Sequence, residues 1–380
     1  MAERAGSLEG LALNRASIQS AFQGRRVLVT GHTGFKGSWL SLWLAERGAH
    51  VTGYALKPPT VPSHFEVAGV REVLADHHEA DLRDTAALQA AVDRAQPDVV
   101  FHLAAQSLVR ESYRAPRETF DVNVLGTAAL LDAVRAAGRP CAVIVVTSDK
   151  CYENREQGPA YRETDPMGGA DPYSASKGAT ELLVQSYRHS FFNPARLPDH
   201  GVKVATARAG NVIGGGDWAK DRIMTDIIRH LVSGQPVPVR NPSAVRPWQH
   251  VLEPLSGYLA LAARMLASDE PQWCGAWNFG PQQSDEVPVR DLVERVCRAW
   301  GQGTWKDVSD PAQPHEAAVL RLSIDKAMSV LGWRPVWNLA ATVDRTVAWY
   351  RRYQANPGHS MRDASLGDIA AYETERCCMR

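Results

Sequence analysis

The chain has no excess of charge of either sign, because 42 Lys and Arg residues balance 42 Asp and Glu residues over 380 positions. This balance argues against nucleic-acid or acidic-membrane partners, which select strongly basic surfaces. No apolar run reaches the roughly 18 uninterrupted residues that a membrane helix needs. The most apolar stretch, 252–266, is interrupted by Glu253, Pro254 and Arg264. We therefore expect a soluble protein with neither kind of partner.

Cysteine is also scarce, with six residues and no C-x-x-C pair, and no signal-peptide pattern opens the chain. These absences predict a reducing, cytoplasmic compartment. The adjacent His77 and His78 have no second ligand pair at metal spacing. We therefore expect a solvent-exposed loop there and no metal site.

What the sequence does contain is a regular alternation of strand and helix patterns. A β-branched run at 26–30 precedes a helix pattern over 38–47 with apolar residues at helical spacing. The alternation continues with a strand over 50–54, a helix over 85–95, a strand over 98–103, a helix over 116–137 and a strand over 142–147. This order predicts an α/β fold with a doubly wound, parallel Rossmann-type sheet.

The pattern changes after a strand at 203–207, where loops rich in Gly, Pro and Trp begin. We predict that the chain divides into four parts, since its length exceeds that of one compact domain. They are an N-terminal extension (1–24), a dinucleotide-binding Rossmann domain (25–207), a smaller mixed α/β, mainly substrate-binding region with some segments returning to the Rossmann domain (208–354), and a partly ordered C-terminal tail (355–380).

A glycine-rich loop stands between the first strand and the first helix. Gly31, Gly34 and Gly37 are spaced three apart, so backbone amides can approach a pyrophosphate at the start of the helix. Such a loop in this context predicts a dinucleotide site. The acid that usually follows the second strand and binds the adenosine ribose is missing, because 53–57 ends in Lys57. NAD and NADP therefore both stay open on physical grounds.

Positive charge near this end of the nucleotide would come from Lys57, His32 and Lys36, unless the lysines are ordinary solvated side chains. Asp81 would accept a hydrogen bond from the adenine amino group, or would cap the helix that begins near Thr85.

Tyr173 and Lys177 form the second candidate site. A tyrosine four residues before a lysine shares one helix face with it, so the ammonium can favour the anionic phenol. Tyr173 is therefore a candidate base near neutral pH.

Together these motifs resemble the extended short-chain dehydrogenase/reductases that act on nucleotide sugars. The similarity spans about 310 residues and includes Gly31-x-x-Gly34-x-x-Gly37, Phe101-His102-Leu103-Ala104-Ala105, Asn123-Val124-Leu125-Gly126-Thr127, Thr147-Ser148-Asp149, Tyr173-x-x-x-Lys177 and Arg208-x-Gly210-Asn211-Val212. Three longer strings, at 31–39, 147–154 and 241–250, resemble the CDP-glucose 4,6-dehydratase branch of that family.

The resemblance implies an internal redox cycle with NAD that removes one water from CDP-glucose. Tyr173 would take the proton from the 4-hydroxyl while Lys177 holds the tyrosinate and the nicotinamide ribose. Ser148 would hydrogen-bond the 4-oxygen, and Asp149 would protonate the leaving 6-hydroxyl. A ketone at C4 acidifies the C5 hydrogen, so a base can remove it.

Position 150 departs from the better-known dehydratases, which place a glutamate there as the C5 base. A lysine abstracts a proton only as the neutral amine, which requires burial or a nearby cation. Three hypotheses compete: Lys150 is the base, Lys150 steadies the enolate, or the base comes from elsewhere, with Glu153 the nearest carboxylate. We favour a place for Lys150 in the site.

The remaining contacts are expectations of the same resemblance. Cofactor contacts are expected from Gly31, Thr33, Gly34, Phe35, Lys36, Gly37, Asp81, Leu82, Leu103, Ala104, Ala105, Tyr173 and Lys177. Substrate contacts are expected from Gln106, Arg110, Ser148, Asn211, Arg222, Arg240 and Arg246, although Arg222 and Arg240 also suit ordinary surface charges. Asn211 and Arg246 would bind the substrate phosphates.

The resemblance further implies a homodimer formed through a four-helix bundle of 116–137 and 176–190, and a product used for deoxysugars of bacterial lipopolysaccharide O-antigen. A 4-epimerase, or a dehydratase acting on GDP-mannose, dTDP-glucose or UDP-glucose, is the alternative, and a non-catalytic dinucleotide-binding protein is a third class. Asp149 favours a dehydratase, and intact Ser148, Tyr173 and Lys177 argue against a mere binder. The nucleotide base rests on resemblance alone.

Overall fold

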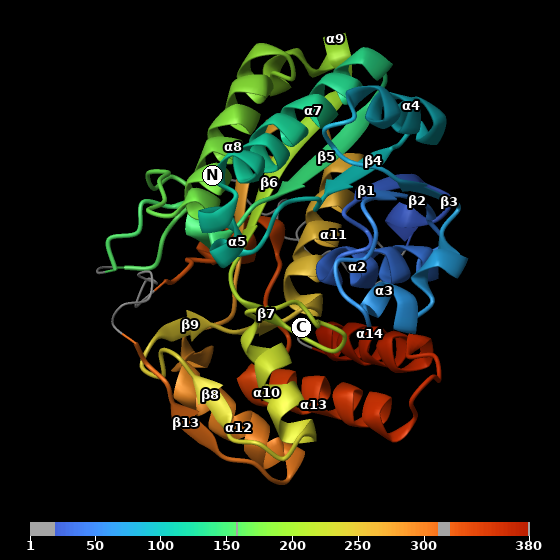
Figure 1. The fold of residues 1–380 in the computed structure, drawn as a ribbon. Helices are drawn as coiled ribbons and strands as arrows, with labels where there is room; N and C mark the ends of the chain where they lie inside the picture. Colours follow the sequence, from blue (N-terminus) through green and yellow to red (C-terminus); the bar gives the residue numbers. More distant parts are fainter. Residues whose placement is uncertain (1–19, 157–158, 311–319, 379–380) are drawn as a thin grey trace, which may run out of the picture.

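The computed structural model describes residues 20–156, 159–310 and 320–378, so most of the predicted N-terminal extension lies outside the described residues. Its centre is a seven-stranded parallel sheet in the order β11-β6-β5-β4-β1-β2-β3 (Figure 1). The strands are β1 Arg26–Thr30, β2 His50–Ala55, β3 Asp76–Glu79, β4 Val99–His102, β5 Cys141–Val146, β6 Val202–Ala209 and β11 Ala276–Phe279. The strand order reverses direction between β1 and β4, which confirms the predicted doubly wound Rossmann-type fold and places a ligand crevice there.

Side chains that alternate in direction along the strands contribute to two apolar cores, one on each face of the sheet. Leu28 and its equivalents pack with α4 Thr85–Ala95, α7 Gly126–Ala137 and α8 Pro172–Ser190. Val27 and Val29 face the opposite core, which contains α2 Phe35–Glu46 and α11 Leu252–Ala267. Successive strand residues point to opposite faces, so both faces are covered and the strands are apolar throughout.

The helix predicted over 116–137 is present but is not uniform. It consists of α6 Pro116–Phe120, a π-helical turn Asp121–Leu125 and α7. A π-turn inside a helix often marks a functional site because it redirects the following side chains. Here it contains Asn123, which lies beside the candidate site.

A second region forms from short strand pairs and helices, drawn in the lower half of Figure 1. The pairs are β7 Val212–Ile213 with β10 Gln249–His250, β8 Val237–Val239 with β13 Trp305–Asp307, and β9 Val245–Pro247 with β12 Glu286–Pro288. The longer helices of this region are α10 Ile223–Val232, α12 Val289–Trp300 and α13 Leu339–Ala355. The short helices α3 His64–Val67, α5 Val109–Arg114 and α9 Leu197–His200 lie outside it, in the Rossmann part of the chain. No helix in the described ranges is both long and apolar enough to cross a membrane.

Two expectations differ from the structure. The C-terminal segment, expected to be a partly ordered tail, contains α14 Arg362–Cys378. This helix buries Ile369 and Tyr372 against the main core, and Glu373 accepts from the indole of Trp43 at 2.7 Å. Tertiary contacts therefore order a segment whose own apolar periodicity is weak.

The loop expected at His77-His78 is also wrong, because both residues belong to β3. β3 forms the edge of the sheet and pairs with β2 alone. A strand with one partner and a polar sequence gives little apolar signal.

Candidate active site

The predicted site residues converge at the carboxyl ends of neighbouring strands. The glycine loop follows β1, residues 103–106 follow β4, residues 147–150 follow β5, and residues 210–211 follow β6. In a doubly wound sheet these ends enclose the ligand crevice.

The glycine loop has the geometry of a diphosphate cradle. Gly31 has φ +75°, and a Cβ there would lie 2.6 Å from the Ala104 nitrogen, so a side chain would displace the loop after β4. A Cβ on Gly37 would collide with the Gly31 carbonyl. The first turn of α2 has no acidic residue, and Gly34 offers no side-chain cap. Its amides and positive helix end thus fit the diphosphate of a dinucleotide.

Other predicted cofactor residues surround this cradle. Thr33 uses its hydroxyl to donate to the Leu56 carbonyl at 2.9 Å. The Asp81 carboxylate accepts from the Arg83 backbone at 2.9 Å and from its guanidinium at 2.6 Å, so Arg83 already engages it. Leu82 is buried against the start of α7.

Positive charge at the nucleotide end is smaller than expected. Burial lowers the pKa of His32 to about 3, and its ring pairs with His77 at 2.7 Å, so His32 is neutral at pH 7. Lys57 is a solvated lysine, 79% exposed and 3.7 Å from Glu79. The expectation of a basic nucleotide end is therefore wrong for His32, and Lys57 fits the surface alternative.

Lys36 lies on the catalytic side of the loop. Burial lowers its pKa to about 8, Arg222 and Lys177 act in the same direction, and Asp149 opposes them. These neighbours are catalytic and substrate candidates, so the expected role of Lys36 beside the adenosine end does not match the structure. Phe35 instead packs beside Gly214 of the second region.

Ser148 and Asp149 form a buried pair directly after β5. The Ser148 hydroxyl donates to Asp149 Oδ1 at 2.9 Å and accepts from the Lys150 backbone amide at 3.2 Å. Asp149 Oδ2 is buried without a hydrogen-bond partner among the described residues. Burial raises the pKa of Asp149, while Lys150, the Ser148 bond, Lys36 and Arg246 oppose the shift. A carboxyl with a raised pKa and one oxygen unpartnered suits a proton donor.

Tyr173 and Lys177 lie one turn apart at the start of α8. Asp171 caps this helix by accepting from the Ser174 amide at 2.9 Å, and Ser112 accepts from the Tyr173 amide at 3.1 Å. The Lys177 ammonium donates to the Val146 carbonyl at 3.3 Å. Both side chains are therefore fixed beneath the end of β5.

The pKa values of Tyr173 and Lys177 differ from the expectation that the ammonium makes the phenol anionic near neutral pH. Burial raises the pKa of Tyr173 to about 12, and its hydrogen bond with Ser148 and the charge of Arg222 only partly oppose the shift. Burial lowers the pKa of Lys177 to about 8, against the charge of Glu181. Tyr173 is thus protonated at neutral pH and needs further positive charge nearby before it acts as a base.

The predicted substrate residues fall into two groups. The first group faces the catalytic residues. The charge of Arg222 opposes the rise in the pKa of Tyr173, and the charge of Arg246 opposes the rise in the pKa of Asp149. The second group, Arg110 and Arg240, pairs with the carboxylate of Asp221.

Asn211 and Gln106 both form hydrogen bonds with other residues of the protein. The backbone carbonyl of Asn211 accepts from the Gln249 amide at 3.1 Å, which joins the end of β6 to β10. The side chain of Gln106 donates to the Leu108 carbonyl and Thr119, and accepts from the Leu108 amide at 2.6 Å. The side chain of Gln106 is thus hydrogen-bonded around its own loop, which does not support the substrate contact expected of it.

One organising side chain, that of Asn123, entered the sequence analysis only as part of a motif and was given no role there. Asn123 accepts from the Gln106 amide at 2.8 Å and donates to the Gln106 carbonyl and to Ser176 Oγ. It thereby joins the loop after β4 to the catalytic helix. The available signal was an asparagine inside an apolar helix pattern, where an amide needs buried partners.

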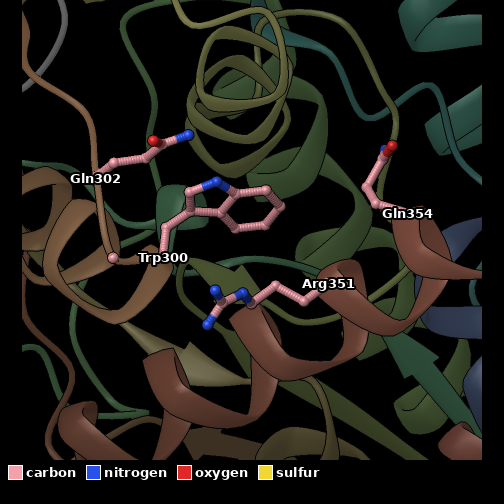
Figure 2. Close-up of a pocket in the computed structure, with 5 residues that line it drawn as sticks. Trp300, Gln302, Arg351 and Gln354 are labelled. Atoms are coloured by element: carbon pink, nitrogen blue, oxygen red, sulfur yellow. The ribbon is translucent and has the colours of Figure 1, made fainter.

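The structure also contains a surface pocket of about 400 Å³ between the ends of α12 and α13, shown in Figure 2. Trp300, Gln302, Arg351 and Gln354 line it together with Gly301. None of the predicted catalytic, cofactor or substrate residues belongs to it.

Comparisons with known proteins agree with this geometry. Residues 28–346 match a family model described as GDP-mannose 4,6 dehydratase. A CDP-glucose 4,6-dehydratase of Salmonella typhimurium strain LT2 is 49% identical over 351 residues, covering 92% of this chain and 97% of that protein. A dTDP-glucose 4,6-dehydratase of Streptomyces antibioticus is 31% identical over 338 residues, covering 87% and 93%.

Among solved structures, DesIV, a dTDP-glucose 4,6-dehydratase from Streptomyces venezuelae solved with NAD and TYD bound, gives a TM-score of 0.72 at 24% identity, covering 87% of this chain and 98% of that one. The epimerase Mth375 from Methanothermobacter thermautotrophicus gives 0.74 at 22% identity, covering 90% and 96%. At these identities the likeness bears on the fold alone.

Proposed function

Because the chain belongs to the family represented by the GDP-mannose 4,6 dehydratase model, we propose that it is a nucleotide-sugar 4,6-dehydratase that converts CDP-glucose to CDP-4-dehydro-6-deoxyglucose and water. The observation that carries the choice of substrate is the 49% identity to a CDP-glucose 4,6-dehydratase over 92% of the chain. Relatives named for dTDP-glucose or GDP-mannose are 24–31% identical.

The oxidation at C4 is assigned to Tyr173, Ser148 and Lys177. Tyr173 receives the proton of the 4-hydroxyl, and Ser148, which hydrogen-bonds with the phenol, also holds the 4-oxygen. The Lys177 ammonium supplies positive charge one helical turn away. Since burial raises the pKa of Tyr173 to about 12, that charge and a cationic ligand are needed to make the phenolate accessible.

The elimination is assigned to Asp149 and Lys150. Asp149 donates its proton to the departing 6-hydroxyl, a role that its raised pKa and unpartnered Oδ2 support. Glu153, the alternative C5 base, has a side chain 53% exposed and paired with Arg155 at 2.9 Å. Its orientation toward solvent favours Lys150 as the group that removes the C5 proton or steadies the enolate.

The cofactor is NAD, held by the glycine loop at Gly31, Gly34 and Gly37 and flanked by Leu103 to Ala105. When bound, it accepts a hydride from C4 and returns it to C6. The neutral His32 and the solvated Lys57 do not themselves supply a fixed positive charge for a 2′-phosphate at the end of β2, which supports NAD over NADP.

The assignment is tested by incubating the protein with NAD and CDP-glucose, dTDP-glucose, GDP-mannose or UDP-glucose in parallel. Loss of one water from CDP-glucose, followed by mass spectrometry, is expected. An isomer of unchanged mass would instead identify an epimerase, and preference for another nucleotide would overturn the choice of base.

We also infer a homodimer formed through α6, α7 and α8. Large apolar side chains lie exposed there, with Leu125 61% and Leu182 57% accessible. Thr180 donates to the Asn123 carbonyl at 3.0 Å, so the two leucines flank one helix contact. Exposed apolar residues gathered on neighbouring helices favour a protein interface.

We assign the enzyme to the cytoplasm and to deoxysugar synthesis for bacterial surface polysaccharide, including O-antigen. The support for the compartment is chemical: Cys141, Cys151 and Cys297 are buried free thiols, as in reducing compartments. The pathway follows from the proposed product and rests on association.

A further inference from the structure

One carboxylate, that of Asp221, lies against two of the arginines expected to contact substrate. Its Oδ1 accepts from Arg240 Nη1 at 2.9 Å and lies 3.7 Å from Arg110 Nε. Arg110 comes from α5, beside the catalytic helix, whereas Arg240 follows β8 in the second region. Asp221 therefore bridges the two parts of the molecule that enclose the crevice.

This bridge lies next to the catalytic residues. Arg110 is two positions before Ser112, which accepts from the Tyr173 amide at 3.1 Å. Asp221 directly precedes Arg222, whose charge acts on both Tyr173 and Lys36. Arg110 and Asp221 are thus each close in sequence to a residue that interacts with Tyr173, which places the bridge beside the catalytic residues.

Carboxylates and diphosphates offer guanidinium groups the same charge and the same paired oxygens. Asp221 and Arg240 are each 38% exposed, and Arg110 is 33% exposed. Ion pairs this accessible contribute little to stability, because water screens both charges. A second anion can therefore replace the carboxylate at small cost.

We propose that Asp221 is a positioning residue that sets substrate affinity, because its carboxylate occupies Arg110 and Arg240 until the substrate diphosphate takes the same guanidinium groups. The inference rests on the proposed function, in which the substrate carries a nucleoside diphosphate. Removal of the Asp221 carboxylate is therefore expected to strengthen the binding of a nucleoside diphosphate, although the carboxylate neighbours the active site. If Asp221 merely held the arginines in place, its removal would weaken binding.

The test measures the binding of CDP to the full chain by titration calorimetry, with Asp221→Asn as the variant. Asp221 has φ +60°, a conformation that asparagine adopts readily, so the loop is preserved. We expect the Kd for CDP to fall about two- to fivefold. The affinity should also depend more steeply on salt, because the site gains one net positive charge.

Asp199→Asn is the matched control for net charge. Asp199 pairs with Arg196 at 2.8 Å on α9, outside the predicted site, and its loss should leave the Kd unchanged. Adding Arg240→Gln to Asp221→Asn should abolish the gain. Asp221→Gly, which also tolerates positive φ, gives a second measurement without any side chain.

A Kd that is unchanged or larger in both Asp221 variants would overturn the inference. That result would leave the proposed function intact, because dehydration of CDP-glucose by the unmodified protein is measured separately. Failure of the unmodified protein to release water from CDP-glucose would instead overturn the proposed function, whatever the Asp221 variants show.

Discussion

Glu181 and Arg208 form an ion pair inside the protein, with Oε2 2.8 Å from Nη2 and both side chains 4% exposed. The other carboxylate oxygen accepts from the Thr147 hydroxyl at 2.5 Å, directly before Ser148. Burial alone would raise the pKa of Glu181, but the charge and hydrogen bond of Arg208 lower it below its usual value. One carboxylate thus connects β6, the end of β5 and the helix that carries Lys177.

Glu181→Gln should destabilise the protein and change its pH profile. The substitution leaves the Arg208 guanidinium buried without its counter-charge, so the free energy of unfolding should fall by about 3–5 kcal/mol in urea denaturation. Glu181 also opposes the burial that lowers the pKa of Lys177 to about 8. Without that charge the ammonium loses its proton at lower pH, so the alkaline fall of kcat/KM should move to lower pH.

The double variant Glu181→Gln with Arg208→Met separates the two effects. It removes both charges and should recover much of the lost stability. The alkaline shift should persist, because Lys177 still lacks the carboxylate one turn away. Recovery of the original pH profile together with stability would show that Glu181 acts only on the fold.

Lys150→Met should stop the reaction after the first oxidation. Methionine keeps the length of the side chain but can neither take a proton nor stabilise an enolate. We expect C4 oxidation to persist, while kcat falls by about 10²–10⁴, the usual contribution of one acid or base. Deuterium from solvent should enter C5 correspondingly more slowly, as measured by mass spectrometry of the sugar nucleotide recovered at fixed times.

Glu153→Gln is the control for this prediction, since Glu153 is the alternative base and its side chain points to solvent. That variant should turn over normally. Normal turnover by Lys150→Met, or loss of activity in Glu153→Gln, would assign the base differently.

Charge on the exposed leucines should separate the proposed dimer. Leu125→Asp with Leu182→Asp places two carboxylates on the exposed apolar positions of the π-helical turn before α7 and of α8, so the mass from light scattering should fall to that of one chain. Val232→Asp, at a 49% exposed position on α10, is the control and should leave the mass unchanged. A variant that keeps the mass of the unmodified protein would place the interface elsewhere.

The predictable parts of the fold are those where local sequence and tertiary structure agree. β1 occupies the predicted 26–30, and α4 occupies the predicted 85–95 because Asp84 caps it by accepting from the Ala87 amide at 2.9 Å. The residues of the catalytic cluster could be found because each follows a recognisable strand or begins a helix. What local pattern could not give is the direction of a side chain, as for Lys36.

The missed features depend on partners distant in sequence. α14 is held by Tyr372, which donates to the buried Glu253 at 2.6 Å, and by Glu373, which pairs with Arg47. β3 is a strand because β2 offers a free edge. Asp221 lies more than a hundred positions from Arg110 in the sequence. Their ion pair is therefore a contact that spacing along the chain does not encode.

His64 joins α2 to α14. Its ring stacks on Trp39 at 4.5 Å, and its nitrogens lie 2.8 Å from Ser38 Oγ and 3.0 Å from Ser365 Oγ. Burial lowers its pKa to about 3, from an ordinary value of 6.5. Between these two pH values the unfolded chain binds the proton and the folded chain does not, so stability falls as pH falls from about 6.5 toward 3.

His64→Gln keeps a hydrogen-bonding side chain but removes this titration. The variant should be less stable than the unmodified protein at pH 7.5, because the stacking on Trp39 is lost. The deficit should shrink by about 2 to 3 kcal/mol at pH 4.5, since one proton over two pH units is worth that amount. Urea denaturation at both pH values measures the difference, with His189→Gln, on the exposed side of α8, as the control. A deficit that is equal at the two pH values would mean that His64 is protonated in the folded protein, and its close packing between two serines and an indole would then have to accommodate a charge.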